Sequence, residues 1–231
     1  MIAVISGATR GIGRAMAFAL AKEGYNLAIG ARNQEQLQEL KSEIISIHSN
    51  IKVLAIKTDF GIIAETKAFA SAVLKEGEVG IIVNNVGVYN EGTVSSEADE
   101  LFEKHIAVNL NSAWYLTRPF LKQMKERQQG HIFNICSTAC ITPRAEAASY
   151  SISKMALYAF HKVLCEEMRE FKVKVTAILP GSVNTSSWDG IDALKERFIQ
   201  PEDIANSAIA ALKSSPYSLV EEIIMKPLNE T

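Results

Sequence analysis

Residues 2–13 read IAVISGATRGIG, in which a run of apolar and β-branched residues leads into a turn with three glycines. The apolar run predicts a buried strand, and the glycines predict a sharp connection to a following helix. Glycines in such a turn let the backbone approach a ligand closely, and the first amides of a helix attract an anion. The segment therefore favours a phosphate-binding turn, with a purely structural turn as the alternative. Its candidate contacts are Gly7, Thr9, Arg10, Gly11, Ile12 and Gly13.

Similar apolar runs recur along the rest of the chain, each separated from the next by room for a helix. They are Ile2–Ile5, Leu27–Ala31, Val53–Ile56, Ile81–Val83, Ile132–Cys136, Val173–Leu179 and Val220–Met225. This alternation is typical of βαβ units, and continuous apolar strands need helices on both faces of a parallel sheet. With 231 residues, 48% of them hydrophobic, the chain fits one large domain. The sequence therefore predicts one α/β domain over residues 1–231, a doubly wound parallel sheet of about seven strands.

Several helix ends are also marked in the sequence. The apolar periodicity after Asn33 predicts an amphipathic helix to Ser49, with Asn33 as its N-cap. Gly24 is suited to end the preceding helix in a left-handed conformation. Pro201 and the two acids that follow it predict the start of a last helix that runs to about Lys213.

The bulk properties exclude several classes of partner. Twenty-four basic and 26 acidic residues give a formal charge of −2, which argues against binding to nucleic acid or to an anionic membrane. No apolar run approaches the ~20 residues that span a bilayer, and no basic leader precedes the first strand, so we expect a cytoplasmic protein. Three cysteines without a Cys-x-x-Cys pair argue against a disulfide framework. His161 and Cys165 lack further ligands nearby, so no metal site is expected.

A second motif indicates proton-transfer chemistry. Tyr150 and Lys154 are four residues apart and share one face of a predicted helix. A nearby ammonium stabilises a phenolate and lowers a pKa that is ordinarily about 10. Ser137, at the end of the fifth predicted strand, would donate a hydrogen bond to an oxygen that gains negative charge. Each signal alone has an ordinary alternative. Tyr150 and Lys154 could be a half-buried tyrosine and a solvated lysine of any helix, and Ser137 could be a serine in a turn at the end of a strand.

In this order the motifs resemble the short-chain dehydrogenase/reductase family from end to end, which implies a Rossmann-type fold. The resemblance rests on the glycine turn, Asn84 to Gly87, Asn109, Ser137, Tyr150, Lys154, Pro180, Gly181, Val183 and Thr185. The spacing Gly-x-x-x-Gly-x-Gly differs from the common Gly-x-Gly-x-x-Gly fingerprint. Ser6, Gly80 and Val86 also differ from the residues usual in the family, and the residues from Val220 to Pro227 are similar to sepiapterin-reductase-like members.

The resemblance implies roles for these positions. Asp59 and Phe60 would bind the adenine end of the cofactor, and Asn85, Val86 and Gly87 would flank its adenosine. Val183 and Thr185, after Pro180 and Gly181, would hold the nicotinamide carboxamide. Tyr150 would be the general acid, Lys154 would also contact the ribose, and Asn109 would support a water relay. From the residues alone, Asn109 is equally well a buried helix residue with local hydrogen bonds.

The end of the second predicted strand favours NADP(H) over NAD(H). Residues 28–33 contain no acid that would bind a ribose 2′-hydroxyl, whereas Arg32 follows the strand and Arg10 lies in the glycine turn. Two guanidinium groups suit a 2′-phosphate. The alternative is a pair of solvated surface arginines.

The substrate is expected to be a small carbonyl compound that binds near a loop over residues 182–200. Trp188, Ile191, Leu194 and Phe198 would form an apolar lid with Gly190 as its hinge, or a helix that buries them permanently. Mixed charges there disfavour the first alternative function, reduction of a 3-oxoacyl thioester on an acyl carrier protein. The alternative from another class is a catalytically silent nucleotide-binding regulator. A sugar-nucleotide epimerase would need a longer substrate domain.

The resemblance also implies a homodimer or homotetramer. In similar proteins, the helices that correspond to Glu97–Arg127 and Tyr150–Phe171 pair between subunits.

Overall fold

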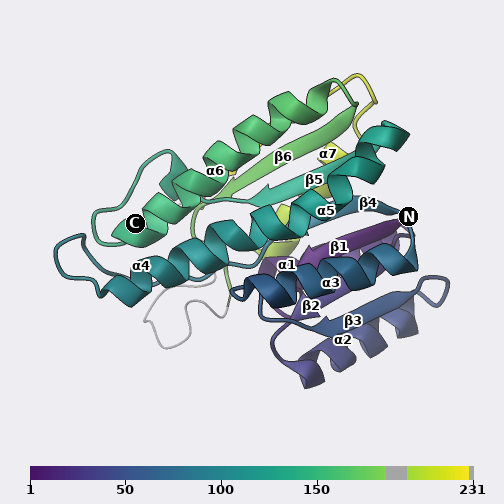
Figure 1. The fold of residues 1–231 in the computed structure, drawn as a ribbon, viewed down its shortest axis with the longest axis horizontal. Helices are drawn as coiled ribbons and strands as arrows, with labels where there is room; N and C mark the ends of the chain where they lie inside the picture. Colours follow the sequence, from purple (N-terminus) through teal and green to yellow (C-terminus); the bar gives the residue numbers. More distant parts are fainter. Residues whose placement is uncertain (186–196, 229–231) are drawn as a thin grey trace.

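Seven parallel strands form one sheet in the order β3-β2-β1-β4-β5-β6-β7. The structure is a computed structural model that describes residues 1–185 and 197–228. The strands are β1 (Ile2–Ser6), β2 (Asn26–Ala31), β3 (Val53–Lys57), β4 (Val79–Asn84), β5 (Gly130–Ile135), β6 (Val173–Pro180) and β7 (Glu222–Met225). The predicted doubly wound sheet in one domain is therefore confirmed (Figure 1).

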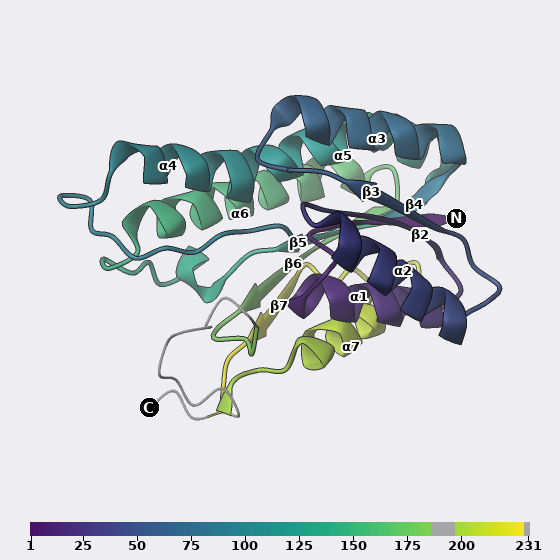
Figure 2. The ribbon, with the colours of Figure 1, turned by 90° about the horizontal axis from the view of Figure 1, so that it is seen from below.

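Helices cover both faces of this sheet (Figure 2). On one face lie α1 (Gly11–Lys22), α2 (Gln34–Ile47) and α7 (Pro201–Leu212). On the other lie α3 (Ile63–Glu76), α5 (Ser112–Arg127) and α6 (Ala148–Arg169), with α4 (Asp99–His105) preceding α5. Because the strands are covered on both sides, their apolar runs are continuous rather than alternating.

Each face has its own hydrophobic core. On the α1 side, Leu20 and Ile204 pack with Ile5 from the sheet. On the α5 side, Phe69 and Phe120 pack with residues of β4 and β5. From β1 the sheet grows outward to β2 and β3 on one side, and β4 then pairs with β1 on the other side. The direction of the strand order therefore reverses between β1 and β4. A crevice at such a reversal, beyond the carboxyl ends of the strands, is where ligands bind in this class of fold.

The expected helix ends are mostly confirmed. The Asn33 side chain accepts a hydrogen bond from Gln36 N at 3.0 Å and caps α2, which ends at Ile47 instead of Ser49. Gly24 has φ = +82° two residues after α1 ends. Pro201 is the first residue of α7, and the preceding Gln200 forms a capping box with Asp203.

The long helix expected over Glu97–Arg127 has an unpredicted interruption. Between α4 and α5 the chain adopts a π-helical segment, Ile106–Asn111, which contains Asn109. A π-helical turn holds one residue more than an α-helical turn, and the apolar periodicity of the sequence does not reveal this insertion. Such turns are frequent at functional sites.

The predicted absence of a membrane span and of a metal site can be compared with the described residues only. Within residues 1–185 and 197–228, no helix is long and apolar enough to cross a membrane. The same part of the chain contains no group of three His, Cys, Asp or Glu side chains that could hold a metal ion. All three cysteines are free and buried.

The core on the α5 side gives a direct test of this packing. Phe120→Ala removes a ring with 0% exposure, so we expect it to lower the free energy of unfolding by about 3–5 kcal/mol. Urea denaturation at an unchanged m-value would measure this loss. Phe102→Ala is the matched control, because Phe102 is 42% exposed and its removal should cost far less. Equal losses at the two positions would contradict the described core.

Candidate active site

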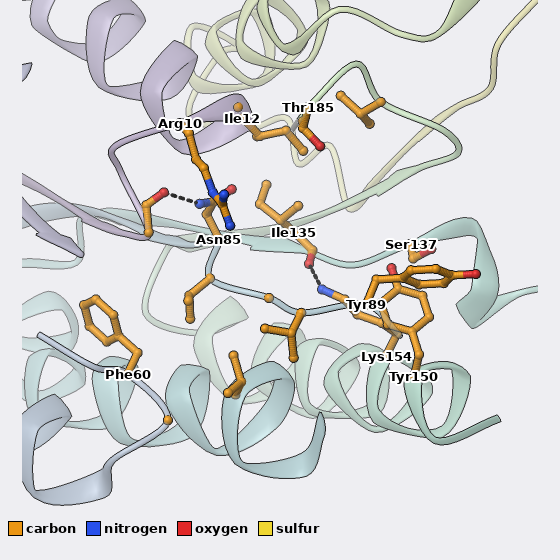
Figure 3. A pocket seen from close by; sticks show the side chains of 18 of the residues that line it. Arg10, Ile12, Phe60, Asn85, Tyr89, Ile135, Ser137, Tyr150, Lys154 and Thr185 are labelled. Atoms are coloured by element: carbon orange, nitrogen blue, oxygen red, sulfur yellow. Dashed lines mark hydrogen bonds between the residues drawn. The ribbon is translucent and has the colours of Figure 1, made fainter. Parts of the chain in front are cut away.

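A cavity of about 700 Å³ opens beyond the carboxyl ends of the strands. Its walls come from the turn after β1, the ends of β2, β4, β5 and β6, and the start of α6. Figure 3 shows Arg10, Ile12 and Thr185 in one region of the cavity and Ser137, Tyr89 and Tyr150 in another. The cavity therefore joins the glycine turn to the Tyr150 region.

Nearly all predicted site residues line this one cavity. They are Gly7, Thr9, Arg10, Gly11, Ile12, Arg32, Asp59, Phe60, Asn85, Val86, Gly87, Ser137, Tyr150, Lys154, Pro180, Gly181, Val183 and Thr185. Gly13 and Asn109 do not line it, but each contacts a residue that does, Gly7 and Val88 respectively. Of the expected lid, Trp188, Gly190, Ile191 and Leu194 lie outside the described residues.

The glycine turn is shaped for a close backbone approach. Gly11 has φ = +52°, and a Cβ at this position would lie 2.8 Å from Thr185 Cγ2. A Cβ at Gly13 would collide with the Gly7 carbonyl oxygen, so Gly13 is needed for packing rather than for ligand contact. Arg10, the N-cap residue of α1, makes no side-chain capping bond. The first amides of α1 therefore have no side-chain acceptor and fit a phosphate group.

Ser6 ties this turn to the loop after β4. Its hydroxyl donates to Val83 O at 3.3 Å and accepts from Asn85 N at 3.0 Å and from Val86 N at 3.1 Å. The Asn85 side-chain amide donates back to the carbonyl oxygens of Ser6 and Gly7 at 2.8 and 3.0 Å. These bonds require a hydroxyl group at position 6. Together with the bonds from Asn85 they tie the end of β1 to the loop after β4, and we call this set of hydrogen bonds the Ser6 clamp.

Asn109 fixes the next part of the same loop. Its Oδ1 accepts from Val88 N at 2.8 Å, and its Nδ2 donates to Val88 O at 3.1 Å and to Ser153 Oγ at 2.9 Å. Both amide protons are thus used within the protein. Asn109 joins the π-helical segment, the loop after β4 and α6, which agrees with the expectation of a buried, hydrogen-bonded residue.

Ser137, Tyr150 and Lys154 meet at the end of β5. Lys154 Nζ is buried and donates to Ile135 O at 2.8 Å, as Figure 3 shows. Ser137 Oγ accepts from Ala139 N at 3.1 Å and caps a short 3₁₀ turn, Thr138–Cys140. This bond does not use the Ser137 hydroxyl proton, and Ser137 is also hydrogen-bonded with Tyr150.

Burial dominates the electrostatics of this group. It raises the pKa of Tyr150, although a hydrogen bond with Ser137 acts in the opposite direction. Burial also lowers the pKa of Lys154. We expect Lys154 and an oxidised nicotinamide together to lower the Tyr150 pKa, and this stays a prediction for the cofactor complex. In the protein alone, burial is the largest effect and raises that pKa. At neutral pH the Tyr150 phenol is protonated.

Three residues at this end of the cavity were not singled out from the sequence. The Tyr89 ring lies edge-on to Tyr150, with centroids 4.9 Å apart, and the buried His105 ring lies 6.0 Å from Tyr150. Arg144 lines the cavity from the loop before α6. Tyr89 and Arg144 are in irregular segments, where no periodicity indicates which way a side chain points.

The two arginines of the cofactor prediction both line the cavity and are exposed. Neither forms an ion pair or a side-chain hydrogen bond with another described residue. The end of β2 carries no acid beside them. Two unpaired guanidinium groups at the glycine-turn end of the cavity fit a second phosphate group better than a neutral hydroxyl.

The family model for "short chain dehydrogenase" matches residues 1–195. An uncharacterized oxidoreductase of Staphylococcus epidermidis is 26% identical over 98% of this chain and 97% of its own length. A Thermococcus sibiricus alcohol dehydrogenase, solved with 5-hydroxy-NADP, has a TM-score of 0.92 and 28% identity over 100% of this chain and 97% of its own. The L-sorbose reductase of Gluconobacter frateurii, solved with NADPH and L-sorbose, has a TM-score of 0.89 and 26% identity over 98% of this chain and 95% of its own.

The Ser6 clamp predicts a specific loss of stability. Ser6→Ala removes the acceptor for Asn85 N and Val86 N, which should lower the free energy of unfolding by about 1–3 kcal/mol. Urea denaturation would measure the loss, with Ser6→Thr as the matched control because it keeps the hydroxyl. A Ser6→Ala protein as stable as the unchanged one would show that the clamp is dispensable.

Proposed function

The chain belongs to the short-chain dehydrogenase family, and we propose that it is an NADP(H)-dependent carbonyl reductase that acts on a small ketone or the corresponding alcohol. Ser137, Tyr150 and Lys154 lie on one cavity with the glycine turn and its two unpaired arginines. This single arrangement carries the proposal, because it provides a proton donor and a dinucleotide cradle in the same space.

The proposal of NADP(H) is supported from two sides. The solved relatives from Thermococcus sibiricus and Gluconobacter frateurii were crystallised with NADP-type cofactors, and a metagenomic short-chain oxidoreductase that is 30% identical was solved with NADP. In this chain, Arg10 and Arg32 would hold the 2′-phosphate. The amides of Gly11 and Ile12 would hold the pyrophosphate.

Bound NADPH supplies the hydride for the carbonyl carbon. Tyr150 donates the proton to the carbonyl oxygen, and the raised pKa of its phenol keeps it in the acid form at neutral pH. Ser137 donates a hydrogen bond to the same oxygen as it gains negative charge. Ser137 Oγ is the acceptor in its bond with Ala139 N, so the hydroxyl keeps its proton, and a substrate oxygen would accept it in place of the Tyr150 hydroxyl.

Lys154 and Asn109 keep these donors in place. The Ile135 carbonyl uses one of the three Lys154 Nζ protons, which leaves two for a ribose or a water. A Cβ on Gly87 would lie 3.3 Å from Lys154 Nζ and 3.4 Å from Asn109 Oδ1, so a larger residue there would crowd the Lys154 ammonium. Asn109 acts by positioning Val88 and Ser153, since both of its amide protons are already used.

Removal of the phenol hydroxyl tests the assigned acid. Tyr150→Phe should lower kcat for NADPH-dependent ketone reduction by about 10² to 10⁴, and it should leave NADPH binding unchanged. NADPH absorbance would measure the rate, and the fluorescence of bound NADPH would measure the binding. Tyr217→Phe is the matched control, because Tyr217 is 99% exposed. Activity of Tyr150→Phe above about a hundredth of normal would contradict the acid role.

The two arginines can be tested separately from the chemistry. Arg10→Gln and Arg32→Gln should each raise the KM for NADPH by about 10-fold or more, because each removes a charged hydrogen bond to phosphate, and should leave the KM for NADH nearly unchanged. Arg169→Gln, a surface arginine paired with Glu166 and Glu221, is the control. Similar KM values for NADH and NADPH in the unchanged protein would count against the assignment.

A further inference from the structure

We propose that Arg144 is a specificity-determining residue that binds an anionic group of the substrate, so that the natural substrate is a carbonyl compound with a carboxylate or a similar anion. The inference rests on the proposed carbonyl reductase function and narrows its substrate class.

The position of Arg144 is fixed relative to the proton donor. Arg144 N donates to Ser151 Oγ at 3.1 Å, and Ala147 N donates to Arg144 O at 3.2 Å. Ser151 directly follows Tyr150 in the first turn of α6. The backbone of Arg144 is thus anchored to the helix that carries Tyr150, while its side chain lines the cavity.

The charge of Arg144 reaches the reaction region. Its guanidinium lowers the pKa of both Tyr89 and Tyr150, although burial is the larger effect on each and raises it. Glu91 and Glu146 also act on Tyr89, but neither lines the cavity. Within residues 1–185 and 197–228, Arg144 forms no ion pair and no side-chain hydrogen bond. The cavity therefore has an unmatched positive charge close to the proposed acid.

The other cations of the cavity have different surroundings. Arg10 lies in the glycine turn, Arg32 follows β2 beside that turn, and Lys154 is buried against Ile135 O. Lys104 is also exposed and directly precedes His105, whose ring centroid lies 6.0 Å from that of Tyr150. Arg144 is an exposed cation of the described lining whose charge is among the largest effects on both Tyr89 and Tyr150.

No described acid of the cavity competes for this charge. Asp59 is the acid of the described lining, and its Oδ1 accepts from Gly61 N at 2.9 Å in the loop after β3. A guanidinium presents paired donors that match a carboxylate, and such bonds are stronger than those between neutral groups. A ketone without an anionic group would leave Arg144 unused.

Matched acid and ester substrates test this inference. NADPH oxidation would be followed with pyruvate, 3-oxobutanoate and 4-oxopentanoate, each compared with its methyl ester. We expect at least one acid to exceed its ester in kcat/KM by about 10-fold to 100-fold, and Arg144→Gln to remove that preference by raising the KM of the acid. The member of the series with the largest preference gives the spacing between the carbonyl and the anion.

Two control variants separate a direct contact from a general charge effect. Arg144→Lys should keep part of the preference, and Lys104→Gln should keep all of it. An equal loss in Arg144→Gln and Lys104→Gln would overturn the assignment. So would equal kcat/KM values for acids and esters in the unchanged enzyme, which would show Arg144 to be a solvated surface arginine while leaving the reductase function intact.

A binding readout keeps the test independent of turnover. Carboxylates that lack the ketone, namely propanoate, butanoate and pentanoate, would be titrated into the protein saturated with NADPH, with the fluorescence of the cofactor as the signal. We expect saturable binding that Arg144→Gln weakens about 10-fold or more. Carboxylate binding that Arg144→Gln does not change, or no binding, would overturn the proposal. Failure of every ketone and ester to be reduced would count against the proposed function instead.

Discussion

The site depends on one contact between two strands that are distant in sequence. The Ser6 hydroxyl, at the end of β1, accepts the amide protons of Asn85 and Val86 after β4, and Asn85 returns two bonds to β1. These bonds hold the glycine turn and the loop after β4 at one edge of the sheet, where the strand order reverses. The position of the glycine turn relative to Tyr150 follows from this edge, because Asn109 joins the same loop to Ser153 of α6 and Lys154 joins α6 to the end of β5.

Desolvation then decides how the reaction region is charged. Tyr150 and Lys154 share a buried space, so burial opposes the charged form of each, raising the pKa of Tyr150 and lowering that of Lys154. The phenol is therefore protonated in the protein alone, which is the form needed to reduce a ketone. The exposed arginines lie where a bound anion would supply a matching negative charge. The cavity thus combines a neutral proton donor with cationic ends.

The sequence predicted the sheet well, because each strand is a continuous apolar run and each helix end has a local signal such as Asn33 or Pro201. Most of the residues named by the family motifs also line the cavity. The π-helical segment at Asn109, the edge-on contact of Tyr89 with Tyr150 and the anchored Arg144 were not predicted. These features depend on tertiary contacts between irregular segments, which no local pattern contains. The burial of Tyr150 was also not predicted, since spacing on a helix indicates which charges are neighbours but not how deeply they are buried.

We propose that a carbonyl group bound in one cavity receives a hydride from NADPH and a proton from Tyr150. The most direct measurement uses NADPH with deuterium at the transferable position of the nicotinamide and follows the label by mass spectrometry in the product of a ketone panel. NADPH labelled on either face of the nicotinamide C4 would be compared. We predict that deuterium from one face only appears on the carbinol carbon, in proportion to the NADPH consumed. Tight binding of NADPH without transfer to any ketone or keto acid would contradict it and would identify a nucleotide-binding protein that does not catalyse reduction.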